Sequence, residues 1–321
     1  MNPHPAGNNG TPDFSWSLSR YGLFNRCRRA YYYRYYGASG GWDVYADERK
    51  RFMYLFKHMK KTEAWLEELT KHAISSVFQK NRSSAGKEIL ERHIYSEVSR
   101  LFFQGWQQVQ AREWQSDPVK LNLFEPYYSD DDSPFFASLD KVKIRMGQIV
   151  KAFVASELFE ELAALDFLAW KLHAKPVSFH VAGTKVWAAP DLVWADKGRI
   201  CLLDIRLSRK EKGKKKKDTL SPAAISVIMT KHKLRTEPAR TNFRTMYIET
   251  LPDKDAIESY DCASVDIGAV EKAISESANE MRSLLGKHGE ADESSFPMVS
   301  DSPAKDCSAC EYKLICTDYP A

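Results

Sequence analysis

The C-terminal part of the chain carries a dense group of thiols. Ten residues of a polar segment contain Cys307, Cys310 and Cys316. A site with four thiolate ligands, for zinc or for an iron–sulfur cluster, needs one more sulfur. The three remaining cysteines are Cys27, Cys201 and Cys262.

Cys27 is the favoured fourth ligand, because it lies among arginines that promote thiolate formation. Cys201 lies in an apolar run typical of a buried strand. Zinc ribbons usually present two C-x₂-C pairs, whereas this set has one pair and single cysteines, which favours a cluster. Joining Cys27 to Cys307 costs about 5 kcal/mol of chain entropy, less than the roughly 10 kcal/mol that such a site supplies. Unligated thiols are the alternative.

Two aspartates flank a predicted β-hairpin. If Lys197 and Gly198 form its tight turn, Asp191 faces Asp204 with their Cβ atoms about 5 Å apart. Such a pair repels unless a cation or a proton lies between the carboxylates, and Mg²⁺ fits oxygen ligands of this kind. Arg206 shares the face of Asp204. A one-residue slip of the hairpin, or ion pairs with nearby Lys or Arg, would remove the metal site.

The formal net charge of +4 is unevenly distributed. Segment Arg20–Lys61 carries +8 and Arg199–Arg240 carries +9, so the rest of the chain carries −13. Such segregation indicates a polyanionic partner, most commonly nucleic acid. The candidate contact residues are Arg20, Arg26, Arg28, Arg29, Lys214, Lys215, Lys216 and Lys217, with Tyr31–Tyr36 available for base stacking. A solvated basic loop is the alternative explanation of the lysine run.

Apolar periodicity predicts a mixed α/β (α+β) protein. We expect helices over 17–36, 63–78, 89–115 and 142–162. Short strands over 177–180, 185–188, 191–195 and 199–207 should form one small sheet, and further elements follow over 222–234, 243–249 and 265–285. The helices position His72, and the sheet positions Asp191, Asp204 and Arg206.

We divide the chain into five segments. They are a flexible N-terminus (1–13), a cysteine-bearing helix with a basic segment (14–62), a helical region carrying His72 (63–175), a core with the two aspartates (176–288) and a cysteine-rich tail (289–321).

Composition excludes several classes of protein. The 321 residues are 43% hydrophobic, the mean hydropathy is −0.48, and no window resembles a transmembrane helix. The first residues lack the apolar segment of a signal peptide. Six cysteines are too few for a disulfide scaffold, which indicates a reducing compartment. We therefore expect a cytoplasmic protein that does not contact membranes.

These motifs resemble the RecB-like PD-(D/E)XK nucleases that carry a cysteine cluster, a group that includes the CRISPR adaptation exonucleases and the AddB subunit of the AddAB helicase–nuclease. The resemblance spans nearly the whole chain. The segments that carry it are Phe14–Ser17, Phe24–Arg29, Tyr31–Tyr36, Gly40–Trp42, Leu69–Ile74, Pro190–Val193, Leu203–Arg206 and the C-terminal cysteines.

The resemblance implies a restriction-endonuclease-like mixed sheet flanked by helices, with a helical N-terminal insertion and a cysteine-rich C-terminal tail. It implies a [4Fe–4S] cluster on Cys27, Cys307, Cys310 and Cys316, and Mg²⁺ or Mn²⁺ on His72, Asp191 and Asp204. It also implies DNA ends as substrate, with helicase or other repair and defence proteins as partners.

Several positions depart from the family pattern. The family lysine is Arg206 here, and a guanidinium cannot act as a base. Lys210 lies about 13 Å farther along the strand. The glutamine of the following helix is missing, as is the glycine before His72; a histidine at the edge of an apolar helix face is more often part of the core.

Two functions fit this pattern. In the first, His72, Asp191 and Asp204 hold the metal ion that hydrolyses DNA, Arg206 neutralises developing charge, and the basic residues bind the backbone. In the second, the protein is an inactive pseudonuclease that serves as a DNA-binding or scaffold subunit of a larger complex.

Overall fold

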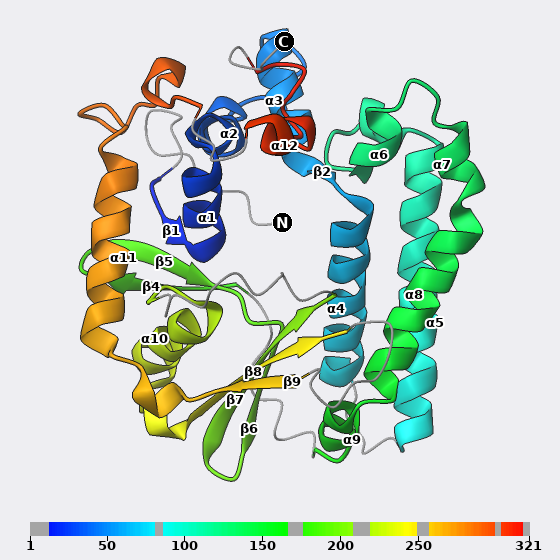
Figure 1. The fold of residues 1–321 in the computed structure, drawn as a ribbon, viewed down its shortest axis with the longest axis vertical. Coiled ribbons are helices and arrows are strands. Elements are labelled where there is room, and N and C mark those ends of the chain that lie inside the picture. The colour runs from blue at the N-terminus through cyan, green and yellow to red at the C-terminus, as the bar shows by residue number, and fades with distance from the viewer. Residues whose placement is uncertain are drawn as a thin grey trace.

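The structure is a computed structural model that describes residues 13–80, 86–165, 176–207, 219–248, 257–298 and 303–316. The predicted flexible N-terminus (except residue 13), Lys210 and the basic run Lys214–Lys217 lie outside these residues. The protein is a mixed α/β protein, as predicted, in which helices lie on both sides of a central sheet (Figure 1).

The N-terminal region is a set of short helices, whereas the sequence predicts a single helix over 17–36. Strand β1 (Trp16–Ser17) leads into α1 (Leu18–Arg26), where the Ser17 hydroxyl accepts a hydrogen bond from the Arg20 amide. Helix α2 (Arg28–Tyr32) and a π-helix, η1 (Tyr33–Gly37), follow. The break occurs because Cys27 adopts an extended backbone (φ −160°, ψ 111°), which ends α1 and begins α2.

A helical layer forms the right-hand side of Figure 1. Its long members are α4 (Thr62–Lys80), α5 (Lys87–Gln110) and α8 (Leu139–Val154). The shorter ones are α6 (Phe124–Tyr127), α7 (Ser133–Ala137) and α9 (Glu157–Ala163). The helix expected over 142–162 is two helices, because Ser156 caps α9 through the Phe159 amide. None of the helices in the described ranges is long and apolar enough to cross a membrane.

The central sheet has the strand order β6-β7-β8-β9. Its strands are β6 (Leu192–Asp196), β7 (Arg199–Arg206), β8 (Thr241–Tyr247) and β9 (Ile257–Tyr260). Strands β6 and β7 form an antiparallel hairpin, and α10 (Pro222–Leu234) connects β7 to the parallel strand β8.

The four predicted strands do not form one sheet. In a separate sheet, β5 (Thr184–Ala188) pairs with β4 (Val177–Val181) on one side and with β1 on the other. Through β5, the β4–β5 hairpin connects the N-terminal strand β1 to the middle of the chain.

Alternate residues of β7 support two cores. Leu203 and Ile205 face the helical layer, whereas Leu202 faces α10 and α11 (Ile267–Arg282). A third core joins η1, α3 (Glu48–His58) and the C-terminal tail, with Tyr33, Phe56 and Tyr312 fully or almost fully buried. Helix α3 lies in the segment that the sequence describes only as basic, and β2 (Met59–Lys60), which pairs with β3 (Asn122–Leu123), joins it to α4.

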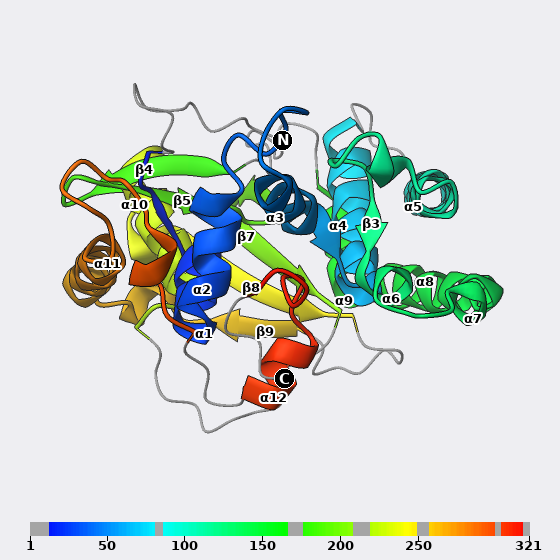
Figure 2. The same ribbon diagram turned by 90° about the horizontal axis from the view of Figure 1, so that it is seen from above.

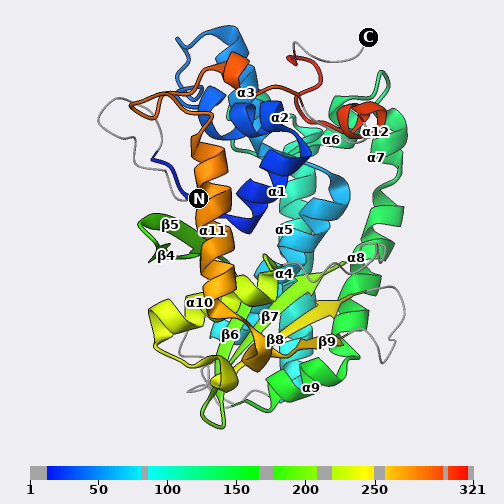
Figure 3. The same cartoon turned by 60° about the vertical axis from the view of Figure 1, so that its left-hand side comes forward.

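The N-terminal helices α2 and α3 and the described part of the C-terminal tail meet at one end of the molecule. Helix α12 (Pro303–Ser308) lies beside α2 and α3 in Figure 1, and the red segment that follows it lies near α2 in Figure 3. Seen from above, α3 lies between α2 and α4 (Figure 2). The N-terminal helices, the tail and the start of α4 therefore form one connected region.

Close packing of the turn after η1 against α3 depends on Gly41. A Cβ atom at this position would lie 2.4 Å from the Lys50 carbonyl oxygen and 2.6 Å from the Tyr54 Cβ. We therefore expect Gly41→Ala to lower the free energy of unfolding by about 1–3 kcal/mol, measured by chemical denaturation. Gly22→Ala is the control, because nothing lies within 4 Å of its added Cβ and alanine favours the helix by up to about 1 kcal/mol. An unchanged stability of Gly41→Ala would contradict the packing described.

Candidate metal-ion and thiol sites

The hairpin adopts the register predicted from its turn. Lys197 and Gly198 both have positive φ (45° and 77°), and Asp196 pairs with Arg199. Leu192 consequently pairs with Leu203, which places Asp191 opposite Asp204 at the end of β6. The two carboxylates therefore come together as expected.

Where β7 has no β6 partner, side-chain carboxylates take the place of a strand and accept hydrogen bonds from its backbone amides. After the Asp191 amide donates to the Leu203 carbonyl (2.9 Å), β6 pairing stops. The next two outward-facing amides of β7 then donate to side chains: Ile205 N–H to Asp191 Oδ2 (2.7 Å) and Leu207 N–H to Glu67 Oε2 (3.1 Å). Unpaired amides at a partly buried edge are costly, so these hydrogen bonds are favourable. They hold the carboxylates of Asp191 and Glu67 beside Asp204.

A lysine from α4 lies among the three carboxylates. The Lys71 Nζ is 3.0 Å from Glu67 Oε1, 3.1 Å from Asp191 Oδ2 and 3.8 Å from Asp204 Oδ1. Arg206 binds Asp204 Oδ2 through Nε (2.9 Å) and Nη2 (2.8 Å), and its Nη1 is 3.6 Å from Glu67. The site thus has three negative and two positive groups.

Burial makes the ionised form of Asp191 unfavourable. Only 15% of the Asp191 side chain and 10% of the Asp204 side chain are exposed. Burial raises the pKa of Asp191 above its ordinary value, Asp204 raises it further, and Lys71 opposes both. A site of this kind favours a bound cation or a proton.

His72 does not join this group. One residue along α4 turns its side chain away from that of Lys71, and His72 is exposed. Its charge acts on Glu97 of α5, whose pKa is lowered first by the hydrogen bond from Arg100 and also by His72. Glu67 and Lys71 take the place predicted for His72; their i, i+4 spacing on a predicted helix is the sequence signal that points to them.

The four predicted cluster cysteines lie in the region where the N-terminal helices meet the C-terminal tail. The Cys27 sulfur accepts a hydrogen bond from the Ala30 amide (3.4 Å), and the Cys310 sulfur accepts one from the Tyr312 amide (3.4 Å). Cys27, Cys310 and Cys316 pack against the third core, and Cys307 lies on α12.

The thiols influence one another electrostatically. Burial raises the pKa of Cys310 to about 12, and the charges of Cys27 and Cys316 contribute in the same direction. Burial and the same two cysteines also raise the pKa of Cys307. Because a bound cation offsets such repulsion and stabilises thiolates, the chemistry of this donor set fits a soft metal ion or an iron–sulfur cluster.

The two other cysteines are core residues. Cys201 is 4% exposed in β7 and Cys262 is 3% exposed beside α10 and α11. Within the described ranges, no group of three or more His, Cys, Asp or Glu side chains is arranged to hold a metal ion.

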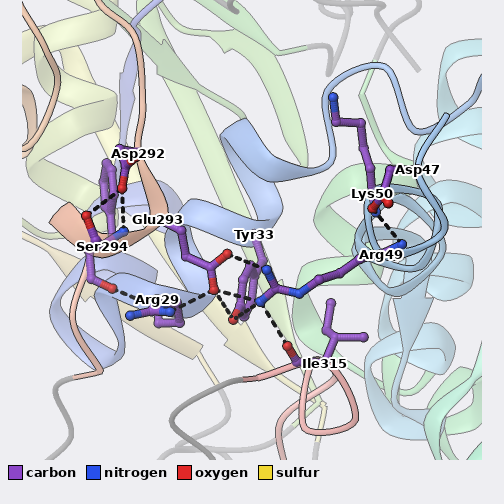
Figure 4. A network of polar contacts seen from close by, with 10 residues as sticks. Arg29, Tyr33, Asp47, Arg49, Lys50, Asp292, Glu293, Ser294 and Ile315 are labelled. Atoms are coloured by element: carbon purple, nitrogen blue, oxygen red, sulfur yellow. Dashed lines mark hydrogen bonds and ion pairs between the residues drawn. The ribbon is translucent and has the colours of Figure 1, made fainter.

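A network around Glu293 holds the tail against the N-terminal helices (Figure 4). In the short helix η7 (Glu293–Ser295), the Glu293 carboxylate accepts hydrogen bonds from Arg29 (2.7 Å), Arg49 (2.6 and 2.7 Å) and Tyr33 (2.8 Å). Arg49 also donates to the Ile315 carbonyl (3.1 Å), next to Cys316. Burial alone would raise the pKa of Glu293, but these donors lower it to about 2.

The predicted nucleic-acid contacts have different surroundings. Arg20 is buried and Arg26 is exposed. Arg28 pairs with Glu280 (2.9 Å) and Arg29 with Glu293. Among the predicted stacking residues, Tyr31 and Tyr33 have 0% exposure and Tyr36 has 8%, so these three rings form part of the core.

Comparison with known proteins adds little to this description. No family model and no curated protein matches the chain. Among solved structures, the chain is similar to one described as the crystal structure of SSO0001, at 15% identity and a TM-score of 0.28 over 58% of this chain and 81% of that one. A similarity this distant carries no argument about function.

The raised pKa of Asp191 predicts a pH-dependent gain from Asp191→Asn. Asp191 ionises in the unfolded chain at a lower pH than in the folded one, so its stability contribution falls as pH rises above the unfolded pKa. We expect Asp191→Asn to raise the melting temperature by several degrees at pH 8, with the gain shrinking toward pH 4. Thermal denaturation across this range checks it, and a variant less stable than wild type at pH 8 would contradict it.

Loss of the Glu293 carboxylate should loosen the tail. We expect Glu293→Gln to increase the alkylation rate of Cys316 and Cys307 several-fold at neutral pH, measured by iodoacetamide labelling and mass spectrometry. The depressed pKa means that the network contributes stability above the ordinary pKa of glutamate and loses it as pH falls toward 2. Cys262 is the internal control, and equal acceleration at Cys262 would indicate general unfolding instead.

Proposed function

We propose that the protein binds DNA and hydrolyses phosphodiester bonds with Mg²⁺ or Mn²⁺ at the site formed by Glu67, Lys71, Asp191, Asp204 and Arg206. The observation that carries this proposal is the pair of buried carboxylates, Asp191 and Asp204, that face each other with an amine between them. The hairpin, crossover helix and parallel strand around them support a PD-(D/E)XK-like fold.

The carboxylates of Glu67, Asp191 and Asp204 would hold the metal ion through their oxygens. A divalent ion supplies an activated water molecule and stabilises charge on the phosphate. The Lys71 ammonium lies against the carboxylates of Asp191 and Asp204 and would compete with a metal ion for them.

Lys71 and Arg206 have different chemical abilities. A lysine amine can release a proton, whereas a guanidinium stays protonated. Lys71 therefore has the chemistry that Arg206, at the position of the family lysine, lacks. Arg206 is held by Asp204 and Glu67 and is 45% exposed, so its remaining N–H groups are available to a phosphate.

One observation favours the second candidate function. The Lys71 ammonium already neutralises the paired aspartates, which is how a site that has lost its metal would be stabilised. In this alternative the protein is a pseudonuclease that binds DNA and serves as a scaffold. A [4Fe–4S] cluster on Cys27, Cys307, Cys310 and Cys316 belongs to both proposals, with a structural role in closing the chain.

A digestion assay tests the proposed function. We expect wild type to degrade end-labelled single- or double-stranded DNA with Mn²⁺ or Mg²⁺, and Asp204→Ala to lose at least a hundredfold of that rate, because one of the paired metal ligands is gone. His72→Ala is the matched control and should digest normally, since His72 lies away from the site. Equal digestion by wild type and Asp204→Ala, or no digestion by either, would reject the proposed nuclease activity.

Lys71→Gln separates the two candidates further. For the nuclease, removal of the competing ammonium should tighten Mn²⁺ binding in calorimetry while digestion falls. For the pseudonuclease, the variant gains metal affinity while neither protein digests DNA.

A further inference from the structure

A small cavity lies where the end of α5 meets β3, α6 and α7. Helices α6 and α7 are at the upper right of Figure 1. The volume of the cavity is about 330 Å³, which is within the range of small-molecule sites in proteins. It shares no residue with the carboxylate site or with the predicted cluster cysteines, so it needs an explanation of its own.

Three aromatic side chains line the cavity and are held in place by packing. The ring of Trp114, in the short helix η2 (Glu113–Gln115), lies 5.2 Å from the ring of Tyr127, with the two planes at 61°. The ring of Phe136 packs edge-on against Trp106, with centroids 6.0 Å apart. Aromatic rings accept apolar groups and also attract organic cations.

A buried amide in the cavity wall lacks a partner. Asn122 lies in β3, where its backbone pairs with Met59 of β2, and the residue is only 2% exposed. Asn122 lines the cavity, and its Nδ2 has no hydrogen-bond partner among the described residues. Because a buried N–H group is costly to leave unpaired, this position points to a ligand that carries an acceptor oxygen.

The charged groups of the lining are mostly acidic. Three consecutive aspartates (130–132) face a single cation, Arg112. The Arg112 Nη2 lies 2.6 Å from Asp132 Oδ2, and Asp131 Oδ1 accepts a hydrogen bond from the Ser133 amide (2.9 Å). Asp130 and Asp131 are exposed and have no cationic partner in the part of the chain that the structure describes. The net negative charge favours a cation and repels phosphate groups.

The combination of these features excludes most classes of ligand. The aspartates would repel a nucleotide or the backbone of nucleic acid. A bare metal ion would leave the aromatic rings without a partner, and a neutral apolar molecule would leave both the aspartates and the Asn122 amide without one. An organic cation with an oxygen atom satisfies the carboxylates, the rings and the amide together.

We propose that this cavity binds a small organic ammonium compound that carries a hydroxyl or carbonyl oxygen, of which the amino alcohols are the simplest members. The oxygen accepts a hydrogen bond from Asn122 Nδ2. The ammonium group lies toward Asp130 and the rings of Trp114 and Tyr127. Binding requires neither a metal ion nor DNA, so the site is independent of the proposed hydrolysis.

Three small probes test the proposal by calorimetry. Choline carries both the ammonium and the hydroxyl group. The alcohol in which carbon replaces the choline nitrogen lacks the charge, and tetramethylammonium lacks the oxygen. We expect choline to bind about tenfold more tightly than either of the others. Equal affinity for choline and its uncharged analogue, or no binding of any probe at millimolar concentration, would overturn the proposal.

Two variants assign the contacts. Asn122→Leu should weaken choline binding about tenfold and leave tetramethylammonium binding unchanged, because only choline offers an acceptor. Its melting temperature should not fall, since the change removes an unpaired buried amide. Asp130→Asn should weaken binding of both cations several-fold, with a smaller effect at high salt.

Glu88→Gln is the matched control for loss of a carboxylate. Glu88 is exposed in the first turn of α5, whereas the cavity lies at the other end of this helix, so neither affinity should change. Asp130→Asn carries the test alone if Asn122→Leu does not fold. Choline affinity that is unchanged in the folded variants, or reduced equally by Glu88→Gln, would contradict the proposed site.

Discussion

The need to satisfy backbone amides at the end of β7 that β6 leaves unpaired governs the site. Strand β6 begins only at Leu192, directly after Asp191, whereas β7 continues past Asp204 to Arg206, and the amides of Ile205 and Leu207 must find other acceptors. Asp191 and Glu67 supply them, so two acidic side chains are drawn to the same edge as Asp204. Lys71 and Arg206 then offset the repulsion. The arrangement of charges is thus a consequence of where one strand ends and its neighbour does not.

A second constraint acts at the other end of the molecule, where the chain closes on itself. Bringing Cys27 and Cys307 together closes a long loop, which costs roughly 5 kcal/mol of chain entropy. The Glu293 network and the aromatic core around Tyr312 oppose that cost with contacts made by protein groups alone. The thiols are therefore gathered by the fold, and a bound metal ion would strengthen a closure that already exists.

Local signals in the sequence predict local structure well. The turn at Lys197 and Gly198 specifies the hairpin register because both residues accept positive φ, and α10 has its predicted bounds. Two other features, the helix break at Cys27 and the residue of α4 that reaches the aspartates, depend on tertiary packing. Periodicity continues through Cys27, so it cannot reveal that the backbone breaks there. His72 and Lys71 differ by one residue, and only the packing of α4 on β7 shows which of them reaches the aspartates.

The helix break at Cys27 has a mechanical meaning. Cys27 belongs to neither α1 nor α2, so its two backbone torsions set the angle between these helices. Arg20 is attached to one arm of this joint and Arg34 lies just beyond the other. A change in the backbone of Cys27 therefore changes the spacing of these two guanidinium groups, so the position of the thiol and the positions of the flanking charges are mechanically linked.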